Sequence, residues 1–346
     1  MESRYNRRIR GLLERESITL NHKQTQMKFY LAPMEGVTSY IFRNAQHEFF
    51  HDIDKYFTPF IAANQTGKLK SKEKKDILPE NNGGLPIVPQ ILTNQADDFI
   101  KTAKDLEAYG YHEVNLNLGC PAGTVVAKCK GSGFLAERDR LDRFLNDIFE
   151  GTDSKISIKT RIGKDSPDEF YELLPIYNQY PLEELVIHPR VQKDFYKNTP
   201  NLEVFRYALK ESKSKVCYNG DIFNKKDYQK FQDQFPEVNT VMLGRGLIGN
   251  PGLVLSIKED WSMDKETLRS FHDRILTDYE QILSGDINVL YKMKELWFYM
   301  MPMFTDSEKY AKKIRKCSRL NEYHEIVTQL FTEKEIAKDA GFYPIN

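Results

Sequence analysis

Residues 115–134, with the sequence NLNLGCPAGTVVAKCKGSGF, place a cysteine directly after a run typical of a buried β-strand. Asn117 ends the apolar run, Gly119 permits a tight turn, and Pro121 stiffens the chain that leaves Cys120. A long glycine-bearing loop follows, and such loops commonly cover ligand sites. A cysteine used only for core packing would need none of this setting. We therefore predict that Cys120 carries a reactive role.

Eight short β-rich runs, which include the strand before Cys120, recur along the chain with intervals long enough for a helix. They cover residues 28–34, 55–62, 86–92, 113–119, 155–163, 184–190, 215–221 and 240–246. The clearest interval is 94–110, where Asn94 can cap a helix that Gly110 ends. Runs apolar on both faces, repeated in eight β/α units, favour an α/β fold of the (β/α)8 TIM-barrel type. An open doubly wound sheet is the alternative.

The pattern changes after Trp261, where helical spacing continues and no β-rich run returns. We therefore divide the chain into three parts. Residues 1–26 form an N-terminal extension that folding does not need, residues 27–260 form the barrel, and residues 261–346 form a small all-α C-terminal domain.

The composition limits the classes of partner. Lys plus Arg number 50 and Asp plus Glu number 50, so any nucleic-acid binding must come from a local patch. The four cysteines show no metal-type spacing with the seven histidines, so we expect no metal and a reducing cytoplasm. No apolar stretch approaches the roughly 20 residues that cross a bilayer, so we expect no membrane contact. We also expect a monomer.

In a TIM barrel the carboxyl ends of the strands meet at one face, where active sites lie. Chemically useful residues end most of the runs: Pro33, Met34, Glu35, Gln90, Asn117, Cys120, Lys159, Arg161, His188, Arg190, Asn219, Gly220, Asp221, Gly244 and Arg245. Lys159 stands out, because an unpaired buried ammonium costs several kcal/mol unless it faces an anion or a cofactor. Residues 244–249 have GxGxxG spacing but follow the last run, which favours a phosphate cup over a dinucleotide fold.

The ordered motifs APMEGVTSYIFR, NLNLGCP, IKTRIG, IHPR, YNGD and GRGLIGNP resemble those of the tRNA-dihydrouridine synthases. The resemblance runs from about Met27 to Trp261, and the helical tail also fits. It implies an FMN-containing barrel that reduces the C5–C6 double bond of uridine in RNA, expected to be tRNA, with NADPH as electron donor. It also implies that the flavin ring and ribityl chain are held by Pro33, Met34, Glu35, Gln90, Lys159 and His188. The phosphate end is then held by Asn219, Gly220, Asp221, Gly244 and Arg245.

The same resemblance gives Cys120 a catalytic role. Hydride from flavin N5 reaches C6 of the uracil, and C5 then needs a proton, which a neutral thiol can donate. Asn117, Arg161, Arg190 and Tyr196 are expected to contact the substrate. Because a base in folded RNA must be turned outward, we expect a pocket for an extruded nucleotide.

A basic stretch in the tail, KYAKKIRKCSRL, offers a docking surface for RNA. On a helix, Lys309, Lys312, Lys313, Lys316 and Arg319 fall on one stripe. A solvated helix face is the simpler interpretation of this stripe, and the resemblance favours RNA contact.

Three other functions remain open from the residues alone. A flavin barrel similar to dihydroorotate dehydrogenases could act on a free pyrimidine and would not need the basic tail. An aldolase-type barrel could form a Schiff base on Lys159, which borohydride would trap. A catalytically silent RNA-binding protein is the third, and yellow protein that releases FMN would count against it and the aldolase.

Overall fold

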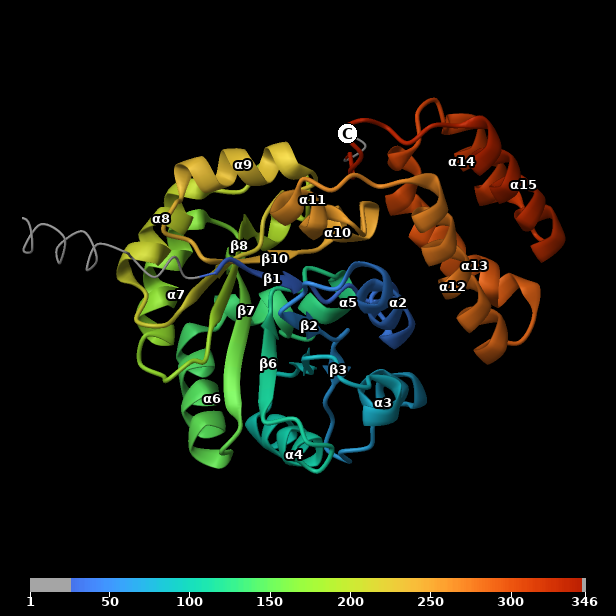
Figure 1. Ribbon diagram of the computed structural model, residues 1–346. Helices are drawn as coiled ribbons and strands as arrows, with labels where there is room; N and C mark the ends of the chain where they lie inside the picture. Colours follow the sequence, from blue (N-terminus) through green and yellow to red (C-terminus); the bar gives the residue numbers. More distant parts are fainter. Residues whose placement is uncertain (1–25, 344–346) are drawn as a thin grey trace, which may run out of the picture.

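The computed structural model describes residues 26–343, so the extension predicted over residues 1–26 lies outside it except for Gln26. One parallel sheet curls through its centre (Figure 1). Its strands are β1 Lys28–Leu31, β2 Lys55–Phe57, β3 Ile61–Ala62, β4 Ile87–Val88, β5 Gln90–Leu92, β6 Glu113–Leu118, β7 Lys155–Gly163, β8 Leu185–Val191, β9 Val216–Tyr218 and β10 Thr240–Leu243.

Two of the eight predicted runs are each divided into two short strands near a proline. Pro59 lies between β2 and β3, and Pro89 lies between β4 and β5, where a missing N–H interrupts the ladder. The halves still pair in step, β2 with β4 and β3 with β5. Because β1 also pairs with β10 and β5 pairs with β6, the eight runs form a closed circuit. The predicted (β/α)8 barrel is therefore confirmed.

Each run is followed by at least one helix, as the barrel requires. These helices are α2 Tyr40–Phe50, α3 Ser71–Ile77, α4 Ala96–Glu107, α5 Gly123–Val126, α6 Arg138–Gly151, α7 Phe170–Tyr177, α8 Leu202–Glu211, α9 Lys225–Gln234, α10 Arg245–Gly249 and α11 Leu253–Glu259. The cap predicted at Asn94 is wrong, because Gln95 precedes α4 and the Asn94 amide bonds elsewhere. Gly110 has a φ of +91° just after the helix, as expected for a residue that ends it.

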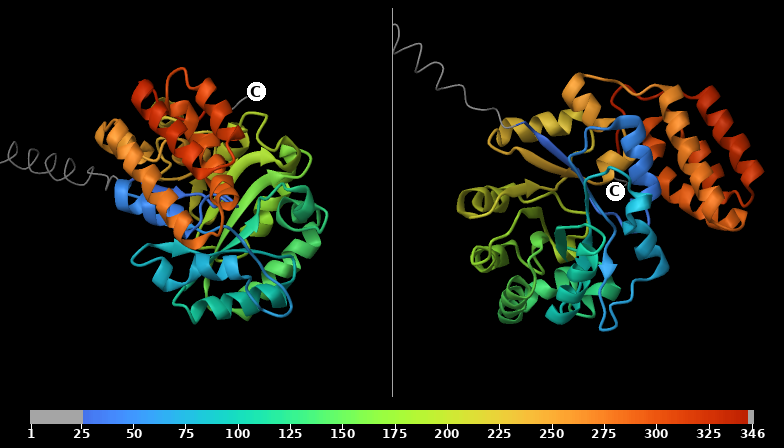
Figure 2. Two further views of the ribbon diagram at one scale, coloured as in Figure 1. Left: turned by 90° about the vertical axis from the view of Figure 1, so that its right-hand side faces the viewer. Right: turned by 60° about the horizontal axis from the view of Figure 1, so that its bottom comes forward.

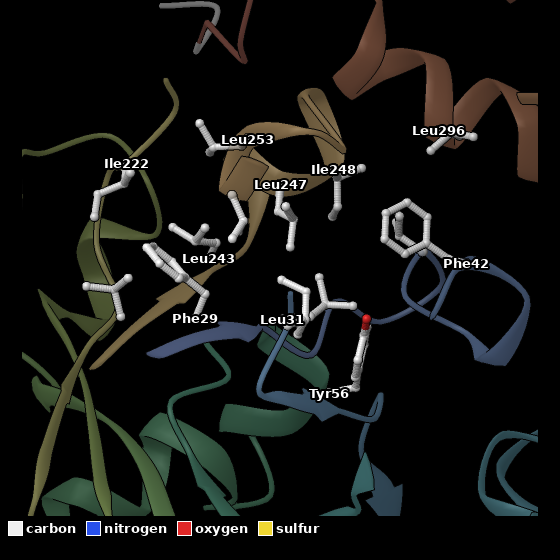
Figure 3. Packing of buried hydrophobic residues seen from close by; sticks show 14 of the residues in the cluster. Phe29, Leu31, Phe42, Tyr56, Ile222, Leu243, Leu247, Ile248, Leu253 and Leu296 are labelled. Carbon is white, nitrogen blue, oxygen red and sulfur yellow. The ribbon is translucent and has the colours of Figure 1, made fainter. Parts of the chain in front are cut away.

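Successive side chains of a strand point to opposite faces of the sheet, so the strands separate two apolar layers. In β1, Phe29 and Leu31 face the helices, whereas Tyr30 points into the barrel with Met242 of β10 and Cys217 of β9. Figure 3 shows the outer layer, where side chains of β1 and β10 pack beneath α10 and α11. This packing fixes the strand ends, and thus the loops that carry the candidate site.

Four more helices form a bundle beside the barrel (Figure 2). They are α12 Lys265–Ile282, α13 Asp286–Met300, α14 Glu308–Lys316 and α15 Leu320–Glu333. The Tyr323 hydroxyl ties three of them together, because the indole N–H of Trp297 donates to it at 2.6 Å and Nε2 of His272 lies 2.5 Å away. The bundle packs on the barrel through α12, whose Phe271 meets Phe42 of α2 edge to face at 5.9 Å. None of the helices within residues 26–343 combines the length and apolarity needed to span a membrane.

Candidate active site

A cavity of about 450 Å³ of empty space, open mouth included, lies at the carboxyl ends of the strands. Its lining contains many of the predicted residues: Pro33, Met34, Lys159, His188, Tyr196, Asn219, Gly220, Asp221, Gly244 and Arg245. Lys159 and His188 come from within β7 and β8, and the others come from the segments that follow β1, β8, β9 and β10, so only a closed barrel brings them together. The barrel mouth therefore holds the candidate site.

Asn117 fixes the turn that carries Cys120. Its side-chain oxygen accepts the backbone N–H groups of Gly119 and Cys120, each at 3.0 Å. Its amide nitrogen donates to Gln90 at 2.7 Å, and the Gln90 amide in turn donates to Asn115 at 2.8 Å. A chain of buried amides thus links the cysteine turn to the barrel interior, which restricts the position of the thiol.

The segment after Cys120 is folded and anchored rather than an open loop. It contains α5 and a 3₁₀ helix, Gly131–Ala136. The Cys120 carbonyl accepts the Ser132 N–H at 3.1 Å and the Ser132 hydroxyl at 2.8 Å. The Asn94 amide donates to the carbonyls of Lys128 and Cys129, both at 3.0 Å. These contacts hold the segment against the Cys120 backbone and Asn94.

The Cys120 thiol is only partly exposed, and its burial raises its pKa above the ordinary value. A hydrogen bond from the backbone of Ala122 and the charges of Lys159 and Arg161 act in the opposite direction without cancelling this effect. The sulfur is therefore a neutral thiol at neutral pH. A neutral thiol can donate a proton and is a weak nucleophile.

Lys159 is the strongest indication of an anionic or polar ligand. Its ammonium lines the cavity, and within residues 26–343 no hydrogen bond or ion pair to it is found. Burial and the neighbouring Arg161 lower its pKa to about 8. Such a cation is costly without a partner, so the cavity is suited to a ligand that supplies negative charge or acceptor atoms.

Asp221 organises the cations of the mouth. Its carboxylate accepts two bonds from Arg190, at 2.9 and 2.5 Å, and one from Arg245 at 2.7 Å. Arg190 also donates to Nε2 of His188 at 3.1 Å, which leaves the His188 proton on Nδ1. Burial and four neighbouring cations hold the pKa of His188 well below its usual range, in agreement with a neutral ring.

Arg161 connects the cysteine turn to the loop after β8. Its Nε donates to the carbonyl of Gly119 at 2.9 Å, and its terminal nitrogens donate to Val191 at 2.9 Å and Phe195 at 2.8 Å. Only 1% of the residue is exposed. Arg161 and Arg190 are both expected to contact substrate, and in the structure several of their N–H donors are bound by protein acceptors. Arg161 thereby fixes Tyr196, next to Phe195, relative to Cys120.

Two residues expected to hold a cofactor lie away from the cavity. Glu35 points outward and pairs with Lys72 at 2.5 Å, and both side chains are about half exposed. Gln90 is fully buried, with its amide bonded to its neighbours. The cavity is also lined by Gly246, which lies inside the predicted 244–249 phosphate cup, and by Phe223, which sequence reasoning missed although it stands two residues after the YNGD motif.

Two glycines of the cavity lining are required by close packing, because a Cβ on either would meet a neighbouring protein atom. A Cβ on Gly220 would lie 2.0 Å from the Tyr218 hydroxyl, and one on Gly246 would lie 2.1 Å from the Ile222 carbonyl oxygen. Tyr218 and Ile222 do not line the cavity, so these contacts show tight packing behind its wall. Together with Arg245, these two glycines form a basic recess of the kind that binds phosphate.

The fold can be compared with a solved structure. The crystal structure of TcOYE with pHBA gives a TM-score of 0.50 at 10% identity and covers 75% of this chain and 96% of that chain. At this identity the similarity concerns the fold alone.

Sequence comparison is more specific. The family described as Dihydrouridine synthase (Dus) matches residues 30–340. The "Probable tRNA-dihydrouridine synthase" of Staphylococcus aureus (strain COL) is 27% identical over 273 residues, which cover 73% of this chain and 78% of that protein. The "Probable tRNA-dihydrouridine synthase 2" of Bacillus subtilis (strain 168) is 28% identical over 230 residues, covering 64% and 70%. Because the family match includes nearly all of the barrel and all four helices of the bundle, the chain belongs to the dihydrouridine synthase family.

Proposed function

We propose that this enzyme reduces the C5–C6 double bond of specific uridines in tRNA to dihydrouridine, with FMN as cofactor and NADPH as electron donor. The observation that supports this most directly is the neutral Cys120 thiol, whose turn is fixed by Asn117 and whose charged neighbours include Lys159. Lys159 lines the cavity and has no partner within residues 26–343, whereas Cys120 is itself not among the lining residues. We place the reaction in the cytoplasm and expect a monomeric enzyme.

The residues of the mouth fit a flavin mononucleotide. The recess of Gly220, Gly246 and Arg245 suits its phosphate, and the Lys159 ammonium suits an acceptor atom of the ring system. When bound, a reduced flavin would supply the hydride for C6 of the uracil. Asn219 is committed to the strands, because its amide donates to the Met242 carbonyl at 2.8 Å, so we assign it a supporting role.

The chain's own residues complete the reaction. Cys120 donates its proton to C5, opposite to the side on which C6 is reduced. Asn117 and Arg161 hold the thiol and the rim in place. Tyr196 is 44% exposed at the mouth, and the Arg245 guanidinium carbon lies 4.4 Å from its ring centre. We assign Tyr196 to contact with the extruded uracil.

The proposed reaction can be tested with purified components. We expect the protein to bind FMN and, with NADPH, to form dihydrouridine in a tRNA transcript, detected by mass spectrometry of nucleosides. Free pyrimidines should remain unreduced, and borohydride should leave Lys159 unlabelled. Turnover of a free pyrimidine without any change in RNA would favour the dihydroorotate dehydrogenase-like alternative. A Lys159 adduct would favour the aldolase.

We assign RNA docking to the helical region, residues 261–346, through the exposed side of α14. Lys309, Lys312 and Lys316 are exposed on α14, as expected for such a surface. Arg319 is also exposed, but the prediction that it continues the same helical stripe is wrong, because α14 ends at Lys316 and Arg319 is the extended residue that precedes α15. Lys313 differs, because its ammonium lies 3.3 Å from the Gln329 side-chain oxygen and 5.4 Å from the ring centre of Tyr310. Arg315, missed in the sequence, is exposed and lines with Lys312 an open hollow between α13 and α14.

Charge reversal of Lys312, Arg315 and Lys316 to glutamate should weaken tRNA binding by at least about tenfold. The slope of log affinity against log salt concentration should become shallower by an amount that corresponds to roughly two to three lost phosphate contacts. FMN content should not change. The matched control reverses Lys210, Lys213 and Lys215, which are exposed at the opposite end of the barrel. Equal tRNA affinity in the two variants, measured by filter binding across a salt series, would refute this surface.

A further inference from the structure

The chain that follows α15 returns from the helical bundle to the barrel mouth (Figure 1). It is held at the bundle where the Ala337 N–H donates to the Met303 carbonyl at 2.7 Å. It is held at the barrel by the Asn250 amide, which donates to the Ala340 carbonyl at 3.1 Å, and by an ion pair of 2.6 Å between Lys226 and Asp339. Residues 337–343 are called the return segment here.

Two glycines allow the return segment to lie directly on the loops of the mouth. A Cβ on Gly249, at the end of α10, would lie 2.8 Å from the Cβ of Phe342. A Cβ on Gly341 would lie 2.5 Å from the carbonyl oxygen of Phe223, a residue of the cavity wall. Neither glycine has a positive φ, so close backbone approach is the reason for both. A glycine on the barrel and a glycine on the return segment thus both make this close contact possible.

This approach buries Phe342 beside the cavity. Only 4% of the residue is exposed, and its ring centre lies 5.4 Å from that of Phe223 and 5.5 Å from that of Tyr299. The guanidinium carbon of Arg245 lies 5.7 Å from the Phe342 ring, 5.0 Å from the Phe223 ring and 4.4 Å from the Tyr196 ring. Arg245 is therefore enclosed by three aromatic rings, while its terminal nitrogen is bound by Asp221.

We propose that Phe342 is a positioning residue, which acts through Arg245 to set how tightly the enzyme binds the phosphate group of its cofactor. The proposal rests on the proposed function, in which Arg245 faces that phosphate. A free arginine side chain has many rotamers, and an enclosure of rings and a carboxylate leaves few of them, so less entropy is lost when phosphate binds. The family match ends at residue 340, before Phe342.

Binding of FMN and of riboflavin, which lacks the phosphate, to cofactor-free enzyme tests this role by flavin fluorescence. We expect Phe342→Ala to weaken FMN binding roughly three- to tenfold, as loss of one cation–π contact predicts, and to leave riboflavin binding unchanged. Phe342→Tyr should restore FMN binding. Tyr343→Ala is the matched control, because Tyr343 is adjacent and 48% exposed and is not among the rings around Arg245.

Phe342→Leu provides the second variant, which keeps most of the buried volume if the alanine variant does not fold. It should show the same selective loss for FMN. The double variant of Arg245→Ala with Phe342→Ala should bind FMN no more weakly than Arg245→Ala alone, because both changes remove one interaction. The inference would be overturned if Phe342→Ala weakened FMN binding and riboflavin binding equally, or if it left the ratio of the two dissociation constants unchanged. A wild-type enzyme that binds no FMN would instead overturn the proposed function.

Discussion

Replacing Cys120 with alanine is expected to leave FMN binding intact and to slow uridine reduction by roughly 10²- to 10⁴-fold, the usual contribution of a general acid. The thiol is held by the Asn117 turn, and burial keeps it protonated by raising its pKa. Alanine removes the proton donor with little change of backbone, because the bonds to Asn117 come from backbone N–H groups. The loss should therefore appear in the chemical step rather than in binding.

Single-turnover kinetics separates these possibilities. The prereduced enzyme is mixed with tRNA, and reoxidation of the flavin is followed by its absorbance. Cys129→Ala is the control, because Cys129 is a partly exposed cysteine in the same segment, and within residues 26–343 its hydrogen bonds are formed by its backbone alone. Near-normal single-turnover rates in Cys120→Ala would remove the thiol from the mechanism. In the wild type, the rate should be level through neutral pH and fall at alkaline pH as the thiol ionises, since only its protonated form donates.

The barrel could be predicted because its strands are apolar on both faces and regularly spaced. The division of two runs near Pro59 and Pro89 is a local matter of missing N–H groups, and both prolines are visible in the sequence. A helix cap depends on contacts that can lie far along the chain. Asn94 was predicted as a cap, but its amide bonds the carbonyls of Lys128 and Cys129, more than thirty positions away. A residue with two possible partners cannot be assigned from its neighbours alone.

The barrel topology predicted which residues reach the mouth, but not which atoms remain available there. Arg161 and Arg190 lie at strand ends as expected, yet their donors bind Gly119, Val191 and Asp221, which belong to other strands or loops. The side-chain amide of Gln90 is likewise hydrogen-bonded to Asn117 and Asn115. These pairings depend on distances across the closed barrel, which residue type and spacing do not encode.

Lys159 is different, because its chemistry was expected from burial alone and the structure provides no partner within residues 26–343. Lys159→Met is expected to stabilise the cofactor-free enzyme and to weaken FMN binding roughly 10- to 100-fold, the range for a hydrogen bond to a charged group. Burial and Arg161 lower the pKa of Lys159 to about 8, from an ordinary value of 10.5. Keeping this ammonium charged in the folded protein therefore costs about 3 kcal/mol at neutral pH.

The sign of this effect gives a pH dependence. Between about pH 8 and 10.5 the unfolded chain binds more protons at Lys159 than the folded chain, so wild-type stability should rise with pH across this window. Below pH 8 the cost is fully present, and above 10.5 it is gone. The advantage of Lys159→Met should thus be largest near pH 7 and vanish toward pH 10.5. Urea unfolding of cofactor-free protein across this range measures it.

Lys155→Met is the matched control, since Lys155 lies on the same strand with its side chain 67% exposed, paired to Glu183 at 3.7 Å. It should change stability by less than about 0.5 kcal/mol and leave FMN binding unaltered. A cofactor-free Lys159→Met protein that is less stable than wild type, or equally stable at every pH, would show that the ammonium has a partner in solution. A gain of stability together with loss of FMN would show that the barrel keeps a destabilising charge because its ligand needs one.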